Sequence, residues 1–387
     1  MNQNKYVFAQ LVDFLPYDDF YYIVKKYKGN KGIRDFSCWN QLLKMMFGQL
    51  AACESLRDLC IFTQAHHQKS YHLGFGNDVN LSTISRANAH RDYRIFEEFA
   101  AQMIAKAQKC RADIELDIKV DGHIYAFDSS TISLCLNVFW WATYKSQKGG
   151  IKLHTLYDVR TQIPEFVIIT PASLNDVNGM DYIAYQAGSY YIFDRGYNDF
   201  ARLYNIHQHK AFFVFRAREN VKFQRMYSIK RALNTGVKSD QIGVFTTGKS
   251  PQRYPEKIRK IRYHDAEHDR EFIFLTNDFH SDARTITELY RKRWGIELFF
   301  KWIKQHLKIK SFWGTTENAV KIQINCAIIA YCLVAIVAKS LKTEHTIYEI
   351  LQILGKSLLD KTPINQLLNK TDYKNVKEQH DNLLIFN

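Results

Sequence analysis

The chain has 387 residues, 46% of them hydrophobic, and carries a formal net charge of +14 at pH 7. This length exceeds the size at which single hydrophobic cores usually split, so two or three structural units with well-filled cores are expected. The charge exceeds what solubility requires and indicates a polyanionic partner, either nucleic acid or an anionic membrane surface.

The seven cysteines are scattered, odd in number and without a Cys-x-x-Cys pair, which suits reduced thiols of a cytoplasmic protein and excludes a disulfide framework or a zinc site. The first residues, MNQNKYVFAQLVDFLP, lack the apolar core of a secretory signal. The longest apolar run, 326–338, is too short for a bilayer of about 30 Å and is predicted to be a buried helix. We therefore expect a nucleic acid partner, a cytoplasmic, nucleoid-associated location and no membrane.

Residues 1–115 are predicted to form an all-helical N-terminal domain that binds DNA. Ser82 or Thr83 can cap a helix that displays Arg86, His90 and Arg91, and this helix resembles the second helix of a helix-turn-helix. Short helices with arginine and serine are common, so an ordinary surface helix is the alternative.

From about residue 118 the apolar period changes from helical to alternating. Three strands, around HIYAFDSS, GIKLHTLYDV and EFVIITPAS, precede a helix start at NDVNGMDY, and then SYYIFDRGY and AFFVFRAR flank another helix. Three meandering strands followed by strands alternating with helices predict an α/β fold, a ribonuclease-H-like mixed sheet, over 116–218.

Residues 219–275 interrupt this alternation with short strand-like runs, turns and basic residues, and are predicted to be a β-rich basic insertion. Residues 276–342 are expected to complete the catalytic core, including the buried apolar helix. Residues 343–387 are expected to form a helical C-terminal tail.

Two aspartates follow apolar strand segments. Asp128 follows IYAF, and Asp194 follows YYIF and begins the turn DRGY. Strand ends of an open sheet meet where ligands bind, and a two-metal site needs carboxylates that converge from separate elements. Turn or helix-capping roles are the alternative. The competing aspartates lie in loops or near helix starts: Asp121, Asp158, Asp176 and Asp181.

The segment YRKRWGIELFFKWIKQHL, 290–307, is predicted to be one helix. At about 100° per residue, one stripe carries Tyr290, Arg293, Glu297, Lys301 and Lys304, and the opposite, apolar side carries Ile296, Phe299, Ile303 and Leu307. Packed on the sheet by its apolar side, this helix can supply Glu297 as a third metal ligand, while the tyrosine and the basic residues line a phosphate backbone. A solvated basic face with intrahelical ion pairs is the alternative.

Lys152 and His154 alternate on the second strand and so share one face of the sheet. That position can bring both near the scissile phosphate. A structural histidine is the alternative.

These residues together resemble the DDE transposases of the insertion sequence 4 family. The spacing of Tyr290, Arg293, Glu297 and Lys304 matches that family's Tyr-Arg-Glu-Lys signature, and AFDSSTISLCL, GGIKLHTLYD, IFDRGYND and FLTN match in order. The start of the chain resembles the helical domain found ahead of the core in many members.

The resemblance implies that Asp128, Asp194 and Glu297 bind two Mg²⁺ ions, with Mn²⁺ able to substitute, and cleave and join DNA. It implies double-stranded DNA partners, both element ends and target, and a homodimer on paired ends. Family members stack a flipped base on a tryptophan of the insertion, but 219–275 contains none. Either Tyr227, Tyr254 or Trp294 substitutes for it, or the route through a DNA hairpin differs.

Three other functions remain open. A metal-dependent ribonuclease-H-like nuclease uses the same fold and ions but does not join DNA. A catalytically inactive DNA-binding relic keeps the charge and loses a carboxylate, which the intact triad disfavours. A membrane-surface protein is also basic, but no amphipathic anchor is visible in the sequence.

Overall fold

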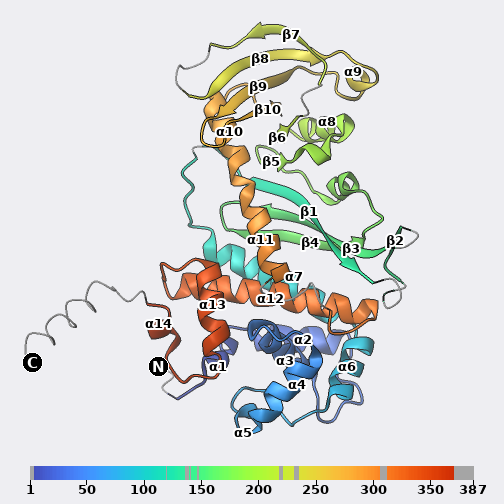
Figure 1. Ribbon diagram of the computed structural model, residues 1–387, viewed down its shortest axis with the longest axis vertical. Coiled ribbons are helices and arrows are strands. Elements are labelled where there is room, and N and C mark those ends of the chain that lie inside the picture. Colours follow the sequence, from blue (N-terminus) through green and yellow to red (C-terminus); the bar gives the residue numbers. More distant parts are fainter. Residues whose placement is uncertain are drawn as a thin grey trace, which may run out of the picture. The chain divides into compact units, whose positions relative to one another are not determined.

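A computed structural model of the chain describes residues 4–118, 120–135, 139, 141–145, 148–217, 221–230, 235–305 and 312–369 (Figure 1). It divides into two compact units. The helical unit comprises Met1–Cys110, Ile303–Gly314 and Asn318–Asn387. The sheet unit comprises Arg111–Trp302 and Thr315–Glu317.

The sheet unit is built on one mixed sheet of ten strands in the described residues, in the order β2-β3-β1-β5-β6-β10-β9-β8-β7, with β4 also paired to β3. Strands β1, β5 and β6 are parallel, and the other neighbours are antiparallel. The strands are β1 Ile124–Leu134, β2 Thr143–Lys145, β3 Lys148–Asp158, β4 Ile163–Pro171, β5 Tyr190–Phe193, β6 Phe212–Arg216, β7 Phe223–Ser228, β8 Val237–Phe245, β9 Ile258–Asp265 and β10 Arg270–Thr276.

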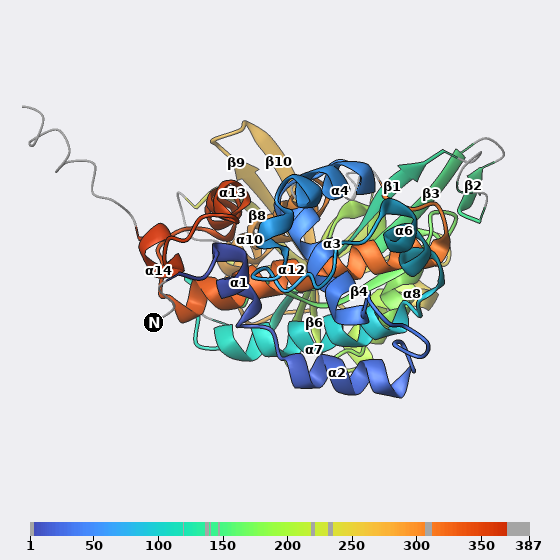
Figure 2. The same cartoon turned by 90° about the horizontal axis from the view of Figure 1, so that it is seen from below.

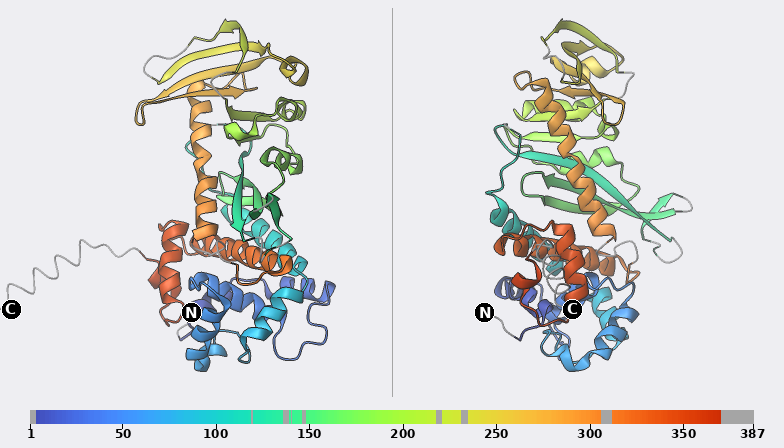
Figure 3. Two further views of the ribbon diagram at one scale, coloured as in Figure 1. Left: turned by 45° about the vertical axis from the view of Figure 1, so that its right-hand side comes forward. Right: turned by 60° about the vertical axis from the view of Figure 1, so that its left-hand side comes forward.

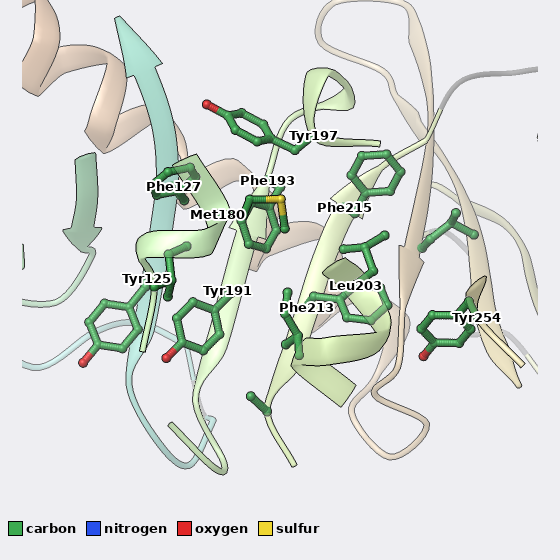
Figure 4. Close-up of a cluster of buried hydrophobic side chains, with 14 of the residues drawn as sticks. Tyr125, Phe127, Met180, Tyr191, Phe193, Tyr197, Leu203, Phe213, Phe215 and Tyr254 are labelled. Atoms are coloured by element: carbon green, nitrogen blue, oxygen red, sulfur yellow. The ribbon is translucent and has the colours of Figure 1, made fainter. Parts of the chain in front are cut away.

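One face of the sheet packs an aromatic core. Because side chains alternate along a strand, the odd-numbered residues of the three parallel strands point to the same side. They meet Met180 of the 3₁₀ turn η1 (Asp176–Tyr182) and Leu203 of helix α8 (Phe200–Gln208) (Figure 4). The strand residues of this core are Tyr125, Phe127, Tyr191, Phe193, Phe213 and Phe215. This face is closed to ligands by packing.

The other face carries two consecutive helices, α10 (Ala283–Lys292) and α11 (Trp294–Gln305), which run along it opposite α8 (Figures 1 and 3). The predicted apolar side of this segment is confirmed, because Ile296, Phe299 and Ile303 are each at most 2% exposed. A Cβ on Gly295 would lie 3.1 Å from the Tyr157 ring of β3, so glycine permits the close approach of helix and sheet.

The predicted β-rich insertion extends the same sheet. Strand β10 pairs with β6, and β9, β8 and β7 add outward from it, with the short helix α9 (Ser250–Arg253) between β8 and β9. A buried ion pair joins Arg259 of β9 to Asp240 of β8 over 2.7 Å. Arg259 also donates to the carbonyl oxygens of Asp278 and Ser281, which ties the added strands to the start of α10.

In the helical unit, the apolar helix α12 (Glu317–Ser340) lies alongside α3 and α7 (Figure 2). This helix has the length and composition of a membrane span, but 94% of its most apolar window is buried inside the protein. The predicted buried helix over 326–338 is thereby confirmed. The other helices are α1 Val7–Val12, α2 Tyr17–Lys26, α3 Cys38–Leu50, α4 Leu56–Ala65, α5 His67–Ser70, α6 Leu81–His90, α7 Arg94–Arg111, α13 Ile347–Ser357 and α14 Ile364–Leu367.

The predicted α/β class, with helices ahead of a mixed sheet, is confirmed. Two details differ from the expectations. NDVNGMDY forms a 3₁₀ turn in place of an α-helix. The sequence predicts that helix α12 belongs to a core over 276–342, but all of it from Asn318 onward groups with the N-terminal helices. Hydrogen bonds tie its first turns to them: Gln49 of α3 donates to the Gln323 carbonyl oxygen, and Asn318 donates to the carbonyl oxygens of Asn88 and Arg91.

Candidate active site

Two aspartates lie on the face of the sheet that carries α10 and α11, because each follows a buried phenylalanine. Phe127 and Phe193 point into the aromatic core, so the next residues, Asp128 and Asp194, point to the opposite face. Strand β1 pairs with β5 only as far as Ala126 and Ile192, so both aspartates lie just beyond the last pair. The sheet topology thus places two carboxylates at one point where neighbouring strands part.

Arg293 joins two of the three predicted metal ligands. Its Nη1 donates to Asp128 Oδ2 over 3.1 Å, and its Nη2 donates to Glu297 Oε1, one turn further along the chain. The Arg293 side chain is 12% exposed, against 22% for Asp128 and 34% for Glu297. A single guanidinium therefore bridges a strand carboxylate and a helix carboxylate.

Two tyrosines complete the cluster. The Tyr290 hydroxyl donates to Asp194 Oδ1 over 2.9 Å, and the Tyr197 hydroxyl, which belongs to the 3₁₀ turn η2 (Arg195–Tyr197), donates to Asp128 Oδ1 over 3.3 Å. The Arg293 guanidinium lies 5.6 Å from the Tyr290 ring centroid. The structure thus brings Asp128, Asp194, Tyr290, Arg293 and Glu297 together. Asp194 occupies the N-cap position of η2, but its side chain makes no capping hydrogen bond there, so the alternative role of Asp194 as a capping residue is not supported.

Burial controls the electrostatics of this cluster. It raises the pKa of Asp128 from 3.8 to about 6, with Asp194 adding repulsion, while Arg293 and the Ser129 amide oppose the rise. Burial also raises the pKa of the Tyr290 phenol to about 12. Burial lowers the pKa of Arg293, but Tyr290 and the carboxylates outweigh it and raise that pKa overall. Three acids and one guanidinium carry a formal charge of −2, which attracts a further cation.

The donor set fits a hard divalent cation, because it consists of carboxylate oxygens from three separate elements. The three carboxylates do not all approach within 4.8 Å of one another; in the described part of the chain one group meets that limit, Asp265, Glu267 and His268 at the β9–β10 turn. Arg293 stands between Asp128 and Glu297 instead. The arrangement is wider than a closed single-ion site and suits ligands shared between ions.

The predicted single helix over 290–307 is interrupted at Arg293. The Arg293 amide donates to the Tyr290 carbonyl oxygen over 3.1 Å, and the Ile296 amide donates to the Arg293 carbonyl oxygen over 3.1 Å, so the chain tightens into i to i+3 bonds between α10 and α11. Beyond the break Lys301 is exposed and Lys304 is half-buried in the last turn of α11. Leu307, predicted on the apolar side, lies outside the described residues.

A small cavity of about 170 Å³ adjoins the cluster on the side of the insertion. Its walls are mostly aromatic, and Phe274 and Tyr290 lie 4.8 Å apart between ring centroids. Trp294 stands at this cavity with 59% of its surface exposed. The other lining residues are Tyr263, Asp265, Phe272, Thr287, Arg291 and Arg293.

Lys152 and His154 do not join the cluster. Strand pairing sets them opposite Thr131 and Ser129, on the aromatic-core face and away from Asp128. Lys152 forms a 2.7 Å ion pair with Asp176, and it is 6% exposed. His154 is fully buried and bonds to Thr170 Oγ1 over 2.9 Å. The prediction that both approach a scissile phosphate is wrong. The two side chains do share a face, but it is the aromatic-core face and not the one that carries Asp128.

Three of the four competing aspartates, Asp158, Asp176 and Asp181, have structural partners, as their alternative interpretation expected. Asp158 accepts from the Arg160 and Thr161 amides in the β3–β4 turn, and Asp181 pairs with Arg202 over 2.7 Å. Asp121 is exposed. Sequence reasoning missed Tyr197 as a partner of Asp128, although it lies inside the IFDRGYND stretch that drew attention to Asp194.

The helical unit carries a second basic surface, around a cavity of about 1010 Å³ between the α2–α3 connection and α6. Arg86 and His90 are exposed on α6, and Asn80 caps that helix by accepting from the Thr83 amide over 2.9 Å, in place of the predicted Ser82 or Thr83. The connection between α5 and α6 is longer than the turn of a helix-turn-helix. Further cations at the cavity are Lys28, Lys31 and Arg34. Arg91, predicted to be displayed with Arg86 and His90, is only 8% exposed and donates to Gln41 Oε1 over 2.8 Å.

Comparisons with known proteins identify a family and several relatives of this chain. The transposase DDE domain family matches residues 121–333, and a domain of unknown function, DUF4372, matches residues 3–76. A Sinorhizobium fredii protein named as transposase y4zB is 34% identical over 286 residues, covering 73% of this chain and 78% of its own.

Two further relatives are named for insertion sequences. A Geobacillus stearothermophilus protein, named as a transposase for element IS5377, is 29% identical over 254 residues and 66% of each chain. A Synechocystis protein, named for element IS4SA, is 25% identical over 299 residues, 74% of this chain and 80% of its own. With the family match extending from before Asp128 to beyond Glu297, the chain belongs to the transposase DDE domain family.

Proposed function

We propose that this chain is a DNA transposase of the insertion sequence 4 type, with a ribonuclease-H-like core, that binds element ends, cleaves them and joins them to target DNA. The observation that carries the proposal is the convergence of Asp128, Asp194 and Glu297, from β1, the end of β5 and α11, on Tyr290 and Arg293. The match of the family over 121–333 spans all five residues.

The three carboxylates are the residues that would hold two Mg²⁺ ions, with Mn²⁺ able to substitute. Bound there, the ions supply Lewis-acid stabilisation and a nucleophile at neutral pH. The protein supplies orientation: Tyr197 holds Asp128 and Tyr290 holds Asp194 by hydrogen bonds. No histidine or cysteine nucleophile is required, in keeping with His154 being buried on the other face.

DNA is proposed to approach along α10 and α11. Exposed Lys301 and half-buried Lys304 follow Glu297 on α11 and offer cations to a phosphate backbone. Trp294, beside the aromatic cavity, is the proposed stacking surface for an unstacked base, in place of the absent insertion tryptophan. Tyr254 is excluded from that role by its burial at 1% exposure, and Tyr227 lies on the distal strand β7.

The helical unit is proposed to bind DNA through its basic cavity, where Arg86 and His90 are exposed on α6. A homodimer on paired ends is the assembly that the resemblance predicts. Arg86→Ala is expected to weaken binding to a labelled end duplex, whereas Arg57→Ala, an exposed arginine on α4, is the matched control.

The test combines purified protein, a labelled duplex carrying the element's own end, and a supercoiled target plasmid, with Mg²⁺ or with EDTA. Metal-dependent nicking followed by joining, lost in Glu297→Gln and retained in Glu288→Gln, is the expected result. Glu288 is a matched control because it is a carboxylate on α10 that pairs with Arg284. Cleavage without joining favours the nuclease alternative, and binding without cleavage favours the DNA-binding relic.

A further inference from the structure

Arg293 occupies the oxygens that the proposed metal site needs. Its two terminal nitrogens contact Asp128 Oδ2 and Glu297 Oε1, so a cation using either oxygen must compete with the guanidinium. A guanidinium is a singly charged, weakly hydrated group whose planar fork of N–H donors matches the oxygens of both carboxylates and phosphates. Such a group can exchange one anion for another.

The contacts of Arg293 are incomplete. Its Nε is buried and has no hydrogen-bond partner, although both terminal nitrogens have one. Buried donors are ordinarily satisfied, and an unmade hydrogen bond weakens the arrangement that leaves it unmade. The carboxylate-bound position therefore leaves Nε unsatisfied, and a phosphate group that accepts from Nε and one terminal nitrogen would give that donor its hydrogen bond.

The surroundings favour such an exchange. Arg293 lies at the interruption between α10 and α11, flanked by exposed Trp294 and followed on α11 by exposed Lys301. A phosphate backbone that passes Trp294 and Lys301 would meet Arg293 on its way to the carboxylates. Three acids facing one guanidinium also keep a formal charge of −2, which a divalent cation compensates more completely.

We propose that Arg293 is an exchangeable internal cation that holds Asp128 and Glu297 until a DNA phosphate takes its guanidinium, so that divalent metal binding depends on DNA being bound. This inference rests on the proposed metal site. By linkage, DNA and metal strengthen each other's binding by the same factor. This exchange would keep the metal occupancy of the active site low whenever no DNA is bound.

The test measures Mn²⁺ affinity directly, by the paramagnetic resonance signal of free Mn²⁺, and does not depend on activity. Titrations use the full-length protein alone and with an already nicked end duplex, with Mn²⁺ bound by the duplex alone subtracted. Arg293→Ala removes the competing charge, and Arg293→Gln removes the charge while keeping an amide that can donate to one carboxylate. Arg284→Ala is the matched control, since it removes one exposed arginine of α10 that pairs with Glu288.

Without DNA, both Arg293 variants should bind Mn²⁺ at least about tenfold more tightly than the wild type, because a unit charge within a few ångströms has been removed. Arg284→Ala should match the wild type. Adding the duplex should tighten binding at least about tenfold in the wild type and less than about threefold in the Arg293 variants. Circular dichroism establishes that each variant is folded, and Arg293→Gln carries the test if Arg293→Ala is not.

Unchanged or weaker Mn²⁺ binding by folded Arg293 variants without DNA would overturn the exchange. A different result would reject the proposed metal site itself. If Glu297→Ala and Asp194→Ala bind Mn²⁺ like the wild type in every condition, the carboxylates hold no metal. If those two variants lose Mn²⁺ binding while the Arg293 variants gain none, the metal site stands and only the exchange is rejected.

Discussion

The hydroxyl of Tyr290 donates to Asp194 Oδ1 over 2.9 Å across a separation of 96 residues in the chain. The bond joins α10 to the end of β5, and Tyr290 also packs on Phe274 of β10. A residue of the helix thereby positions a strand-end carboxylate, while its ring seals the inner wall of the aromatic cavity.

Tyr290→Phe removes this hydroxyl and leaves the ring in place. Hydrogen bonds to charged acceptors contribute about 1.5–3 kcal/mol, so the free energy of unfolding should fall by about that amount and the rate of metal-dependent strand cleavage should fall about tenfold or more. Urea denaturation and single-turnover cleavage measure the two effects. Tyr204→Phe, a hydroxyl on α8 at the other face, should change neither; equal losses in both variants would reject the positioning role.

The elevated pKa of Asp128 predicts a pH-dependent stability with a definite sign. The folded-state pKa, about 6, exceeds the ordinary value of 3.8, so between these values the folded chain binds more protons than the unfolded chain. Stability contributed by this group is therefore present below pH 4 and is lost as the pH rises to about 6. Two pKa units correspond to about 3 kcal/mol at most.

Asp128→Asn mimics the protonated acid and should abolish this dependence. In EDTA the variant should be more stable than the wild type by about 2–3 kcal/mol at pH 8 and nearly equal to it at pH 4. Denaturant titrations at several pH values provide the measurement. Asp181→Asn is the control of opposite sign, because Arg202 lowers the pKa of Asp181. A stability difference for Asp128→Asn that is the same at both pH values would contradict the prediction.

Replacing one partner of the buried pair Arg259–Asp240 should lower the free energy of unfolding strongly. Both side chains are 3% exposed, and Asp240→Ala leaves a buried guanidinium without its carboxylate. Removing one partner of a buried pair costs about 3–5 kcal/mol, whereas the double replacement Asp240→Leu with Arg259→Met should recover part of that loss. The recovery is limited because Arg259 also bonds to two carbonyl oxygens.

A matched surface pair provides the comparison. Arg262 of β9 and Glu271 of β10 place Nε and Oε2 3.9 Å apart, and both side chains are more than half exposed, so Glu271→Ala should change the free energy of unfolding by less than about 1 kcal/mol. Denaturant midpoints of the variants decide the matter. Similar small effects at both pairs would show that the buried pair does not tie the added strands to the core.

Trp294→Ala should weaken DNA binding without unfolding the protein. The side chain is 59% exposed, so little packing is lost, but stacking on one base contributes about 1–3 kcal/mol. Affinity for the element-end duplex should fall about fivefold to a hundredfold. Leu298→Ala, 50% exposed one turn further along α11, is the control. An equal loss from both variants would indicate general contact with DNA and no stacking site.

The residue types and their periods were enough to predict much of this protein. Alternation within IYAF and YYIF predicts strands that bury Phe127 and Phe193, and it follows that Asp128 and Asp194 share the other face. Apolar spacing in 290–307 predicts the side that packs on the sheet, and the long apolar run 326–338 predicts the buried helix. These features depend on local period and burial, which the sequence carries by itself.

Only the tertiary structure decided which face each set of side chains occupies and which partners they find. Lys152 and His154 share a face by alternation, but the strand register that sets His154 opposite Ser129 puts it away from Asp128. The stripe from Tyr290 to Glu297 is local, whereas its contacts depend on β1, β5 and α11 meeting at one place. Register, helix breaks and long-range hydrogen bonds arise from packing between distant segments, and no local pattern of residues encodes them.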